Sequence, residues 1–177
     1  MDTKNIAIAR VIKANGGEYR QLELREYTLS EFLRVIGQAG ETAQWSKIIS
    51  SVSGWPDQAV DQLGARDLEE AKAFLQGFSR QAQDFGAWSE EPRTVHLDAA
   101  VQFGGTDYAA LDLREYTVGE KRRAETHSGE HKQWAQVIAA VSGWPLPAVE
   151  KLPITKYWEA RWYLEGFTLA GRATGES

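Results

Sequence analysis

A helical pattern of apolar residues is the clearest feature of the first half of the chain. Its members recur at i, i+3, i+4 and i+7, which places them on one face of an α-helix: they are Trp45, Ile48, Ile49 and Val52. Gly54 follows and can take the left-handed conformation that ends a helix, while Pro56 prevents the helix from continuing. The pattern predicts a helix that ends near residue 53, with Trp55 folded back onto its last turn.

The same pattern recurs 89 residues later. Residues 19–78 align with residues 108–167 without a gap, and 27 of the 60 positions are identical. The second predicted helix and its stop carry Trp134, Val137, Ile138, Val141, Gly143, Trp144 and Pro145. Two copies at this period are too few for a solenoid, so the sequence predicts a tandem duplication of a domain of about 80 residues. A pseudo-two-fold arrangement of the copies is the natural hypothesis.

Each copy begins with the pattern of a β-hairpin, in which apolar residues lie on both sides of a glycine turn. The first copy has Ile6, Ile8, Val11 and Ile12 before Asn15-Gly16-Gly17, and Tyr19, Leu22 and Leu24 after it. The second copy has Val95, Leu97, Val101 and Phe103 before Gly104-Gly105, and Tyr108, Leu111 and Leu113 after it.

Helices are predicted to follow each hairpin. Thr28 with Glu31, and Thr117 with Glu120, have the spacing of a capping box, so a first helix should start there and run to about Gly40 in the first copy. A last helix is predicted by the apolar residues Leu68, Ala71, Leu75 and Phe78, matched by Tyr157, Ala160, Leu164 and Phe167. The predicted fold is therefore α+β and mainly helical, with a hairpin and about three helices in each copy.

The domain boundaries follow from this repeat. We expect a first repeat over residues 1–86, a linker over residues 87–92, a second repeat over residues 93–170 and a flexible tail over residues 171–177.

Composition and charge exclude several classes of function. The chain has 20 Lys and Arg against 25 Asp and Glu, for a net charge of −5, so no nucleic-acid partner is expected. The absence of cysteine excludes disulfides, thiolate zinc sites and a cysteine nucleophile. No run of 18 apolar residues occurs, so no membrane partner is expected, and the N-terminal residues contain no apolar run as long as that of a signal peptide. We expect a soluble protein that is not exported.

Few residues suggest chemistry. His127 and His131 have a spacing that could bind a metal from one helical face, with solvated surface histidines as the favoured alternative. The glycine pairs lack the pattern of a phosphate-binding loop, and no pair of carboxylates stands out, so no cofactor and no catalytic residue are predicted.

Two repeated motifs have both a functional and a structural interpretation. Arg25-Glu26 and Arg114-Glu115 lie where the hairpin leads into the first helix, and can line a binding groove or form a local ion pair, which we favour. The two Trp-Pro steps can form a partner-binding platform or a hydrophobic plug at a helix stop, which we also favour.

Differences between the copies indicate candidate partner-binding residues. Phe32, Leu33 and Ile36 stand where the second copy has Lys121, Arg122 and Glu125. Conversely, Trp158 and Trp162 stand where the first copy has Glu69 and Ala73. This surplus apolar surface must pack between the repeats, which we favour, or bind a partner.

The repeated motifs resemble the small tail assembly chaperones of long-tailed and contractile-tailed bacteriophages and their prophages. The matching positions of the first copy are Leu22, Leu24, Arg25, Thr28, Ile49, Gly54, Pro56, Val60, Leu63, Gly77 and Phe78. Those of the second are Leu111, Leu113, Arg114, Thr117, Ile138, Gly143, Pro145, Val149, Leu152, Gly166 and Phe167. The chain departs from the family pattern because it carries two copies where members usually carry one.

The resemblance implies a non-enzymatic protein of the host bacterial cytoplasm that binds the phage tape-measure protein and tail-tube subunits during tail assembly. Helix-in-groove contacts would hide the apolar surface of the client proteins. Two alternatives remain open, namely a structural or adaptor component of the tail or baseplate and a small hydrolase with a cleft between the repeats. Self-association also stays open.

Overall fold

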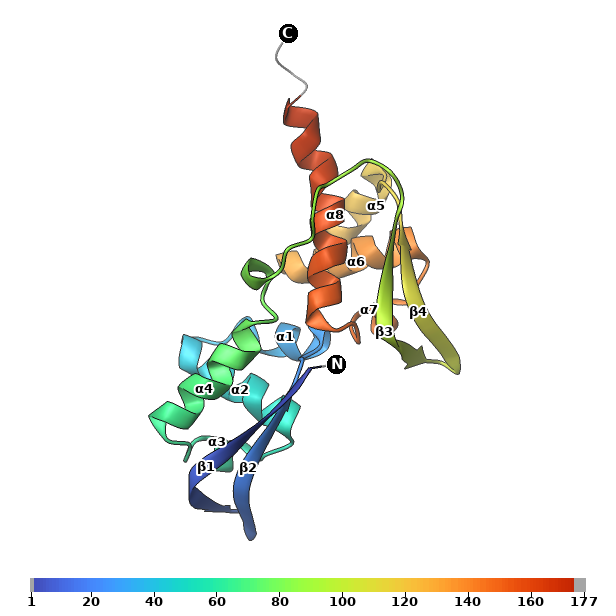
Figure 1. Ribbon diagram of the computed structural model, residues 1–177. Coiled ribbons are helices and arrows are strands. Elements are labelled where there is room, and N and C mark those ends of the chain that lie inside the picture. Colours follow the sequence, from blue (N-terminus) through green and yellow to red (C-terminus); the bar gives the residue numbers. More distant parts are fainter. Residues whose placement is uncertain (1, 174–177) are drawn as a thin grey trace. The chain divides into compact units, whose positions relative to one another are not determined.

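The computed structural model describes residues 2–173 of the chain, with side chains as far as residue 169 (Figure 1). The chain forms two compact units, Met1–Gln83 and Asp84–Ser177. Each unit contains an antiparallel β-hairpin followed by helices, so the predicted α+β, mainly helical duplication is confirmed.

The two units have the same order of elements. The first consists of β1 (Thr3–Ala14), β2 (Gly17–Arg25), α1 (Leu29–Val35), α2 (Glu41–Ser53), α3 (Asp57–Val60), α4 (Ala65–Gln76) and the 3-10 turn η1 (Arg80–Ala82). The second consists of β3 (Arg93–Phe103), β4 (Thr106–Leu113), α5 (Val118–Ala124), α6 (Glu130–Ser142), α7 (Leu146–Val149) and α8 (Ile154–Ala173).

The helices of each unit pack on one face of its hairpin (Figure 1). In the first unit α2 packs against β2, and α3 and α4 pack against β1; α6, α7 and α8 contact the second hairpin in the same way. The inward-facing hairpin residues are buried: Ile6, Ile12, Leu22 and Leu24 in one unit, and Val95, Val101, Leu111 and Leu113 in the other. Each unit is thus a two-layer domain with its own core.

Both hairpins carry the same irregularity. The register shifts between Ala7 and Ile12, so four residues of β1 stand opposite one residue of β2, and an identical shift separates His96 from Val101. A bulge of this kind changes which side chains face the core. It turns Ile12 inward and leaves Val11 41% exposed.

The first helix has the predicted start but a different end. Thr28 caps α1 and the full capping box with Glu31 is present. The helix stops at Val35 rather than near Gly40. Glycines are poor helix formers, and Gly40 adopts a φ of +91° that a side chain would disfavour, so the chain turns between α1 and α2.

The helix stop after α2 is as predicted. Gly54 has a left-handed φ of 72°, and its counterpart Gly143 has 73°. Pro56 and Pro145 follow, and they are the N-cap residues of the short helices α3 and α7.

The contact boundary between the units falls before the segment predicted as a linker, residues 87–92. The Trp88 indole donates a hydrogen bond of 2.8 Å to the backbone oxygen of Tyr163, and its ring stands edge-on to Phe167 at 5.1 Å. This contact needs a glycine at position 166, because a Cβ there would lie 1.9 Å from the Trp88 ring. Part of the segment is therefore packed on α8. The predicted tail, residues 171–177, begins inside α8, and residues 174–177 lie outside the described part of the chain.

Candidate functional site

The repeated arginine forms an ion pair at the corner between strand and helix. Arg25 binds Glu31 through two hydrogen bonds, Nη1 to Oε2 at 3.0 Å and Nη2 to Oε1 at 2.7 Å. Glu31 also accepts hydrogen bonds from the Thr28 backbone N–H at 2.8 Å and from the Ser51 hydroxyl at 2.8 Å. The partner of Arg25 is thus Glu31, the glutamate of the capping box. At Glu26, Arg25 donates to the backbone carbonyl oxygen instead.

The second unit repeats this corner. Arg114 binds Glu120 with distances of 3.1 and 2.6 Å, and the Thr117 backbone N–H donates to Glu120 at 2.7 Å. Burial alone would raise the pKa of Glu31, but hydrogen bonds from Arg25, Thr28 and Ser51 outweigh it and lower the pKa to about 2. Hydrogen bonds from Arg114 and Thr117 likewise lower the pKa of Glu120 to about 2. Both carboxylates thus belong to hydrogen-bond networks that hold the first helix of each unit to the preceding strand.

The Trp-Pro steps also serve the fold. Trp55 is 7% exposed and packs against Tyr19 with ring centroids 4.9 Å apart. Trp144 is 8% exposed and packs against Tyr108 at 4.8 Å. Each indole closes the turn of its hairpin onto the end of a helix, which favours the plug over the partner-binding platform.

The two spaced histidines have different environments. His127 is exposed, as expected of a surface residue. His131 is half-buried, and its Nδ1 lies 2.9 Å from the Tyr157 hydroxyl and 3.0 Å from a guanidinium nitrogen of Arg161. The expectation of a solvated His131 is wrong because α8 places these two side chains against it. Among residues 2–173 no group of three or more His, Cys, Asp or Glu is placed to hold a metal ion.

The two surplus tryptophans of α8 are packed by residues of their own unit. Trp158 is 7% exposed, and its ring lies 5.4 Å from that of His131 and 4.9 Å from that of Tyr157. Trp162 is half-buried between the Phe85 ring at 5.7 Å and the Arg93 guanidinium at 5.2 Å. Packing within one repeat is a third explanation of this apolar surface, beside the two that the sequence left open.

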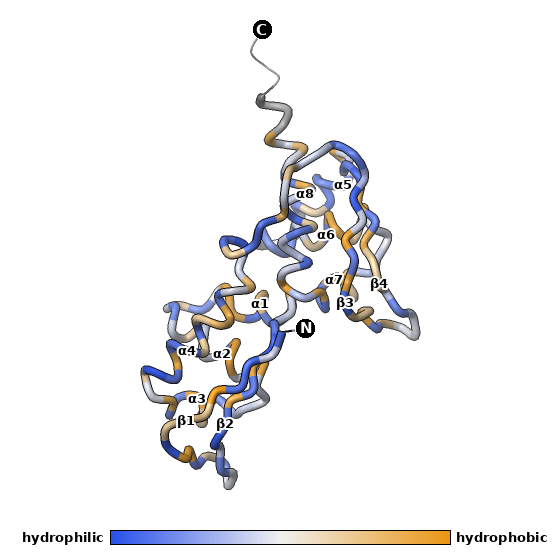
Figure 2. Tube along the Cα trace, viewed as in Figure 1, coloured by the Kyte–Doolittle hydropathy of each residue, from blue (hydrophilic) through white to orange (hydrophobic). Residues whose placement is uncertain are grey.

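The surplus apolar residues of α1 are more accessible. Ile36 is 39% exposed, and Phe32 and Leu33 are half-buried. We call these three residues the α1 face. Their counterparts on α5 are Lys121, Arg122 and Glu125, and α5 is coloured mostly as hydrophilic in Figure 2. Lys121 lies over the Trp134 ring with its ammonium 4.0 Å from the centroid. The first unit thus presents an apolar helix face where the second unit has polar residues.

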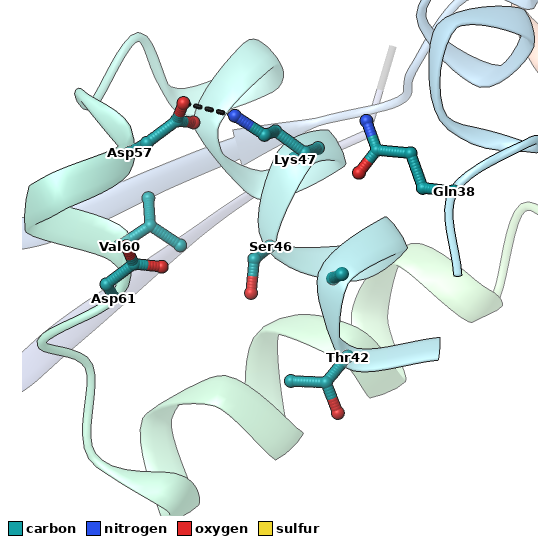
Figure 3. A pocket seen from close by; sticks show the side chains of 8 residues that line it. Gln38, Thr42, Ser46, Lys47, Asp57, Val60 and Asp61 are labelled. Carbon is teal, nitrogen blue, oxygen red and sulfur yellow. Dashed lines mark hydrogen bonds and ion pairs between the residues drawn. The ribbon is translucent and has the colours of Figure 1, made fainter. Parts of the chain in front are cut away.

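The first unit also contains an open groove of about 410 Å³ between α2 and α3 (Figure 3). Its lining residues are Gln38, Thr42, Ala43, Ser46, Lys47, Asp57, Val60 and Asp61. Lys47 of α2 forms an ion pair with Asp57 of α3, and its hydrogen bond lowers the pKa of Asp57. We refer to this feature as the α2–α3 groove.

Comparison with known proteins gives one family. A model of the phage tail assembly chaperone proteins, E, or 41 or 14, matches residues 5–80 and again residues 94–169. The chain belongs to this family of phage tail assembly chaperones. No curated protein and no solved structure matched the chain.

The two family matches coincide with the two copies of the duplication. Each matched range starts inside the first strand of a hairpin and extends past the Gly-Phe pair at positions 77–78 or 166–167. The chaperone therefore carries two family domains in one chain. Within residues 2–173 no helix combines the length and the apolar character needed to cross a membrane.

Sequence reasoning missed several contacts of this chaperone. Two further ion pairs recur at equivalent positions: Lys4–Glu70 (3.0 Å) with Arg93–Glu159 (2.8 Å), and Lys72–Glu41 (2.9 Å) with Arg161–Glu130. The two copies have charges of the same sign at these four aligned positions, and this could have indicated the ion pairs. The α2–α3 groove had no such signal, because it depends on how α2 and α3 pack against each other.

Proposed function

We propose that this chaperone binds the tape-measure protein and the tail-tube protein of its phage during tail assembly, in the host bacterial cytoplasm and without catalysis. The observation that carries the proposal is the double match to the tail assembly chaperone family over residues 5–80 and 94–169. Tail components made before assembly expose surfaces that later become buried, and such surfaces need a transient partner.

The α1 face is the proposed client-binding surface. It combines a 39% exposed Ile36 with Phe32 and Leu33 on a short helix, a geometry suited to an amphipathic helix of the client. The net charge of −5 favours clients with basic residues around their apolar stripe. Because Trp158 and Trp162 pack within their own unit, we do not extend the proposed surface to them.

Co-expression with the tape-measure and tube proteins encoded beside this chain tests the proposal. We expect co-elution, with a mass by light scattering that equals a complex. The triple variant Phe32→Lys, Leu33→Arg, Ile36→Glu installs the residues of the second unit, which the same fold tolerates, and should abolish co-elution. Val118→Glu is the matched control, since Val118 is 84% exposed in the second unit.

Two results would count against the proposal. If the wild-type chain elutes alone beside both candidates, it does not bind them. If the chain is found in purified phage particles, it is a structural or adaptor component of the tail rather than a transient chaperone.

A further inference from the structure

The two units provide a matched pair in which equivalent faces of α2 and α6 differ in exposure. In the first unit Thr42 is exposed and Ser46 is half-buried along the α2–α3 groove (Figure 3). Their counterparts in the second unit are His131, which is half-buried, and Ala135, which is 1% exposed. The same helix face is therefore covered in one unit and accessible in the other.

Trp158 is one residue that covers this face in the second unit. It extends from α8, and its ring meets the His131 ring edge-on at 5.4 Å. The equivalent position on α4 is Glu69, which is exposed. The groove of about 410 Å³ falls within the range of about 300–1,000 Å³ of ligand-binding pockets. In the second unit, an indole presented by a helix thus lies against the face that is equivalent to one wall of the groove.

We propose that the α2–α3 groove binds an aromatic side chain, tryptophan first, carried on a helix of a client protein. The inference rests on the proposed chaperone function and names the feature of the client that is recognised. The exposed Ala43 supplies apolar surface in the wall, where Val60 lies 3% exposed, and the rim carries Asp61 beside the Lys47–Asp57 ion pair. This acidic rim favours a client in which a basic residue follows the aromatic by one helical turn, as Arg161 follows Trp158.

N-acetyltryptophanamide is the first probe, with N-acetylalaninamide as its control. We expect saturable chemical-shift changes at the amides of Thr42, Ser46 and Val60 of the full chain, with a Kd of about 1 mM, an affinity typical of a single buried side chain. Absence of such changes up to ~20 mM, twenty times that Kd, would overturn the inference.

Two variants borrow their residues from the second unit. Glu69→Trp should fill the groove from within and remove the response to the probe. Ala73→Trp places the same residue one turn along α4, at the position of Trp162, and should leave the response intact. Thr42→Trp closes the groove from α2 and serves if Glu69→Trp does not fold. A probe response that survives in a folded Glu69→Trp or Thr42→Trp variant would overturn the inference.

Co-elution with the tape-measure protein separates this inference from the proposed function. A client affinity at least tenfold weaker for Glu69→Trp than for Ala73→Trp would support the groove as the aromatic-binding site. If the wild type and Glu69→Trp bind the client equally, the groove inference fails and the chaperone function stands. If the wild type binds no client but still responds to the probe, the proposed function fails and the groove remains an aromatic-binding site.

Discussion

Replacing Glu31 by glutamine should destabilise the first unit in a way that depends on pH. The carboxylate joins Arg25, the start of α1 and Ser51 of α2 through hydrogen bonds of 2.7 to 3.0 Å. Glutamine has nearly the same shape but cannot accept both Arg25 bonds while also accepting from Thr28 and Ser51. The corner between the hairpin and α1 would lose its charge-assisted contacts.

The magnitude follows from the pKa of Glu31. A decrease from 4.5 to about 2 corresponds to about 3 kcal/mol at ~1.4 kcal/mol per unit, and solvent screening of Arg25, whose side chain is 37% exposed, reduces this to about 2 kcal/mol. Because the folded pKa lies below the unfolded one, this stability is fully present above pH 4.5 and is lost as the pH falls towards 2. The variant should therefore be weaker at pH 7 and should converge with the wild type near pH 2.

Urea unfolding between pH 7 and pH 3, with hydrogen exchange to locate the loss in residues 1–83, measures this effect. Glu120→Gln is the matched variant, and its loss should be smaller, about 1 kcal/mol, because Arg114 is 49% exposed and alanine stands at the position of Ser51. Equal pH dependence of the free energy of unfolding in Glu31→Gln and the wild type would refute the reasoning.

Three further substitutions have expected outcomes. Ser51→Ala removes a hydrogen bond of 2.8 Å to Glu31 and should lower the free energy of unfolding by about 1 kcal/mol in urea titrations at pH 7. Gly166→Ala would place a Cβ 1.9 Å from the Trp88 ring, so the indole N–H resonance of Trp88 should move and amide exchange over residues 84–92 should accelerate; an unchanged resonance would contradict this packing. Trp158→Ala should destabilise the second unit by about 3–5 kcal/mol in thermal unfolding, whereas a loss below about 1 kcal/mol would mean that the indole is not part of a core.

The order of elements was predictable because the duplication displays each local signal twice. The capping boxes at Thr28 and Thr117 and the helix stops at Gly54 and Gly143 depend on residues close in sequence, and the structure has them at the predicted positions. The end of α1 was not predictable from its apolar pattern, because the turn towards α2 depends on the backbone conformation of Gly40.

Contacts between distant residues could not be predicted in the same way. Arg25 and its neighbour Glu26 suggested a local pair, yet the guanidinium crosses the corner to Glu31, six positions on. Trp88 lies in a stretch with the composition of a linker, but its hydrogen bond to Tyr163 spans 75 positions.

The candidate site was also predictable only in part from the sequence. Alignment of the copies identified Phe32 and Trp158 as positions where the repeats differ. It could not show that Trp158 packs against His131 while Ile36 stays 39% exposed, since that depends on which helix faces which. Comparing the exposure of equivalent residues in the two units therefore identified the accessible surfaces better than the positions of aromatic residues in the sequence did.

The central claim is that this tail assembly chaperone binds tail proteins through a surface of its first unit. Light scattering of the full chain co-expressed with its tape-measure protein tests the claim most directly. The account predicts a co-eluting complex that Phe32→Lys, Leu33→Arg, Ile36→Glu abolishes and Val118→Glu leaves intact. A complex that survives the triple variant, or a wild-type chain that elutes without the tape-measure protein, would contradict it.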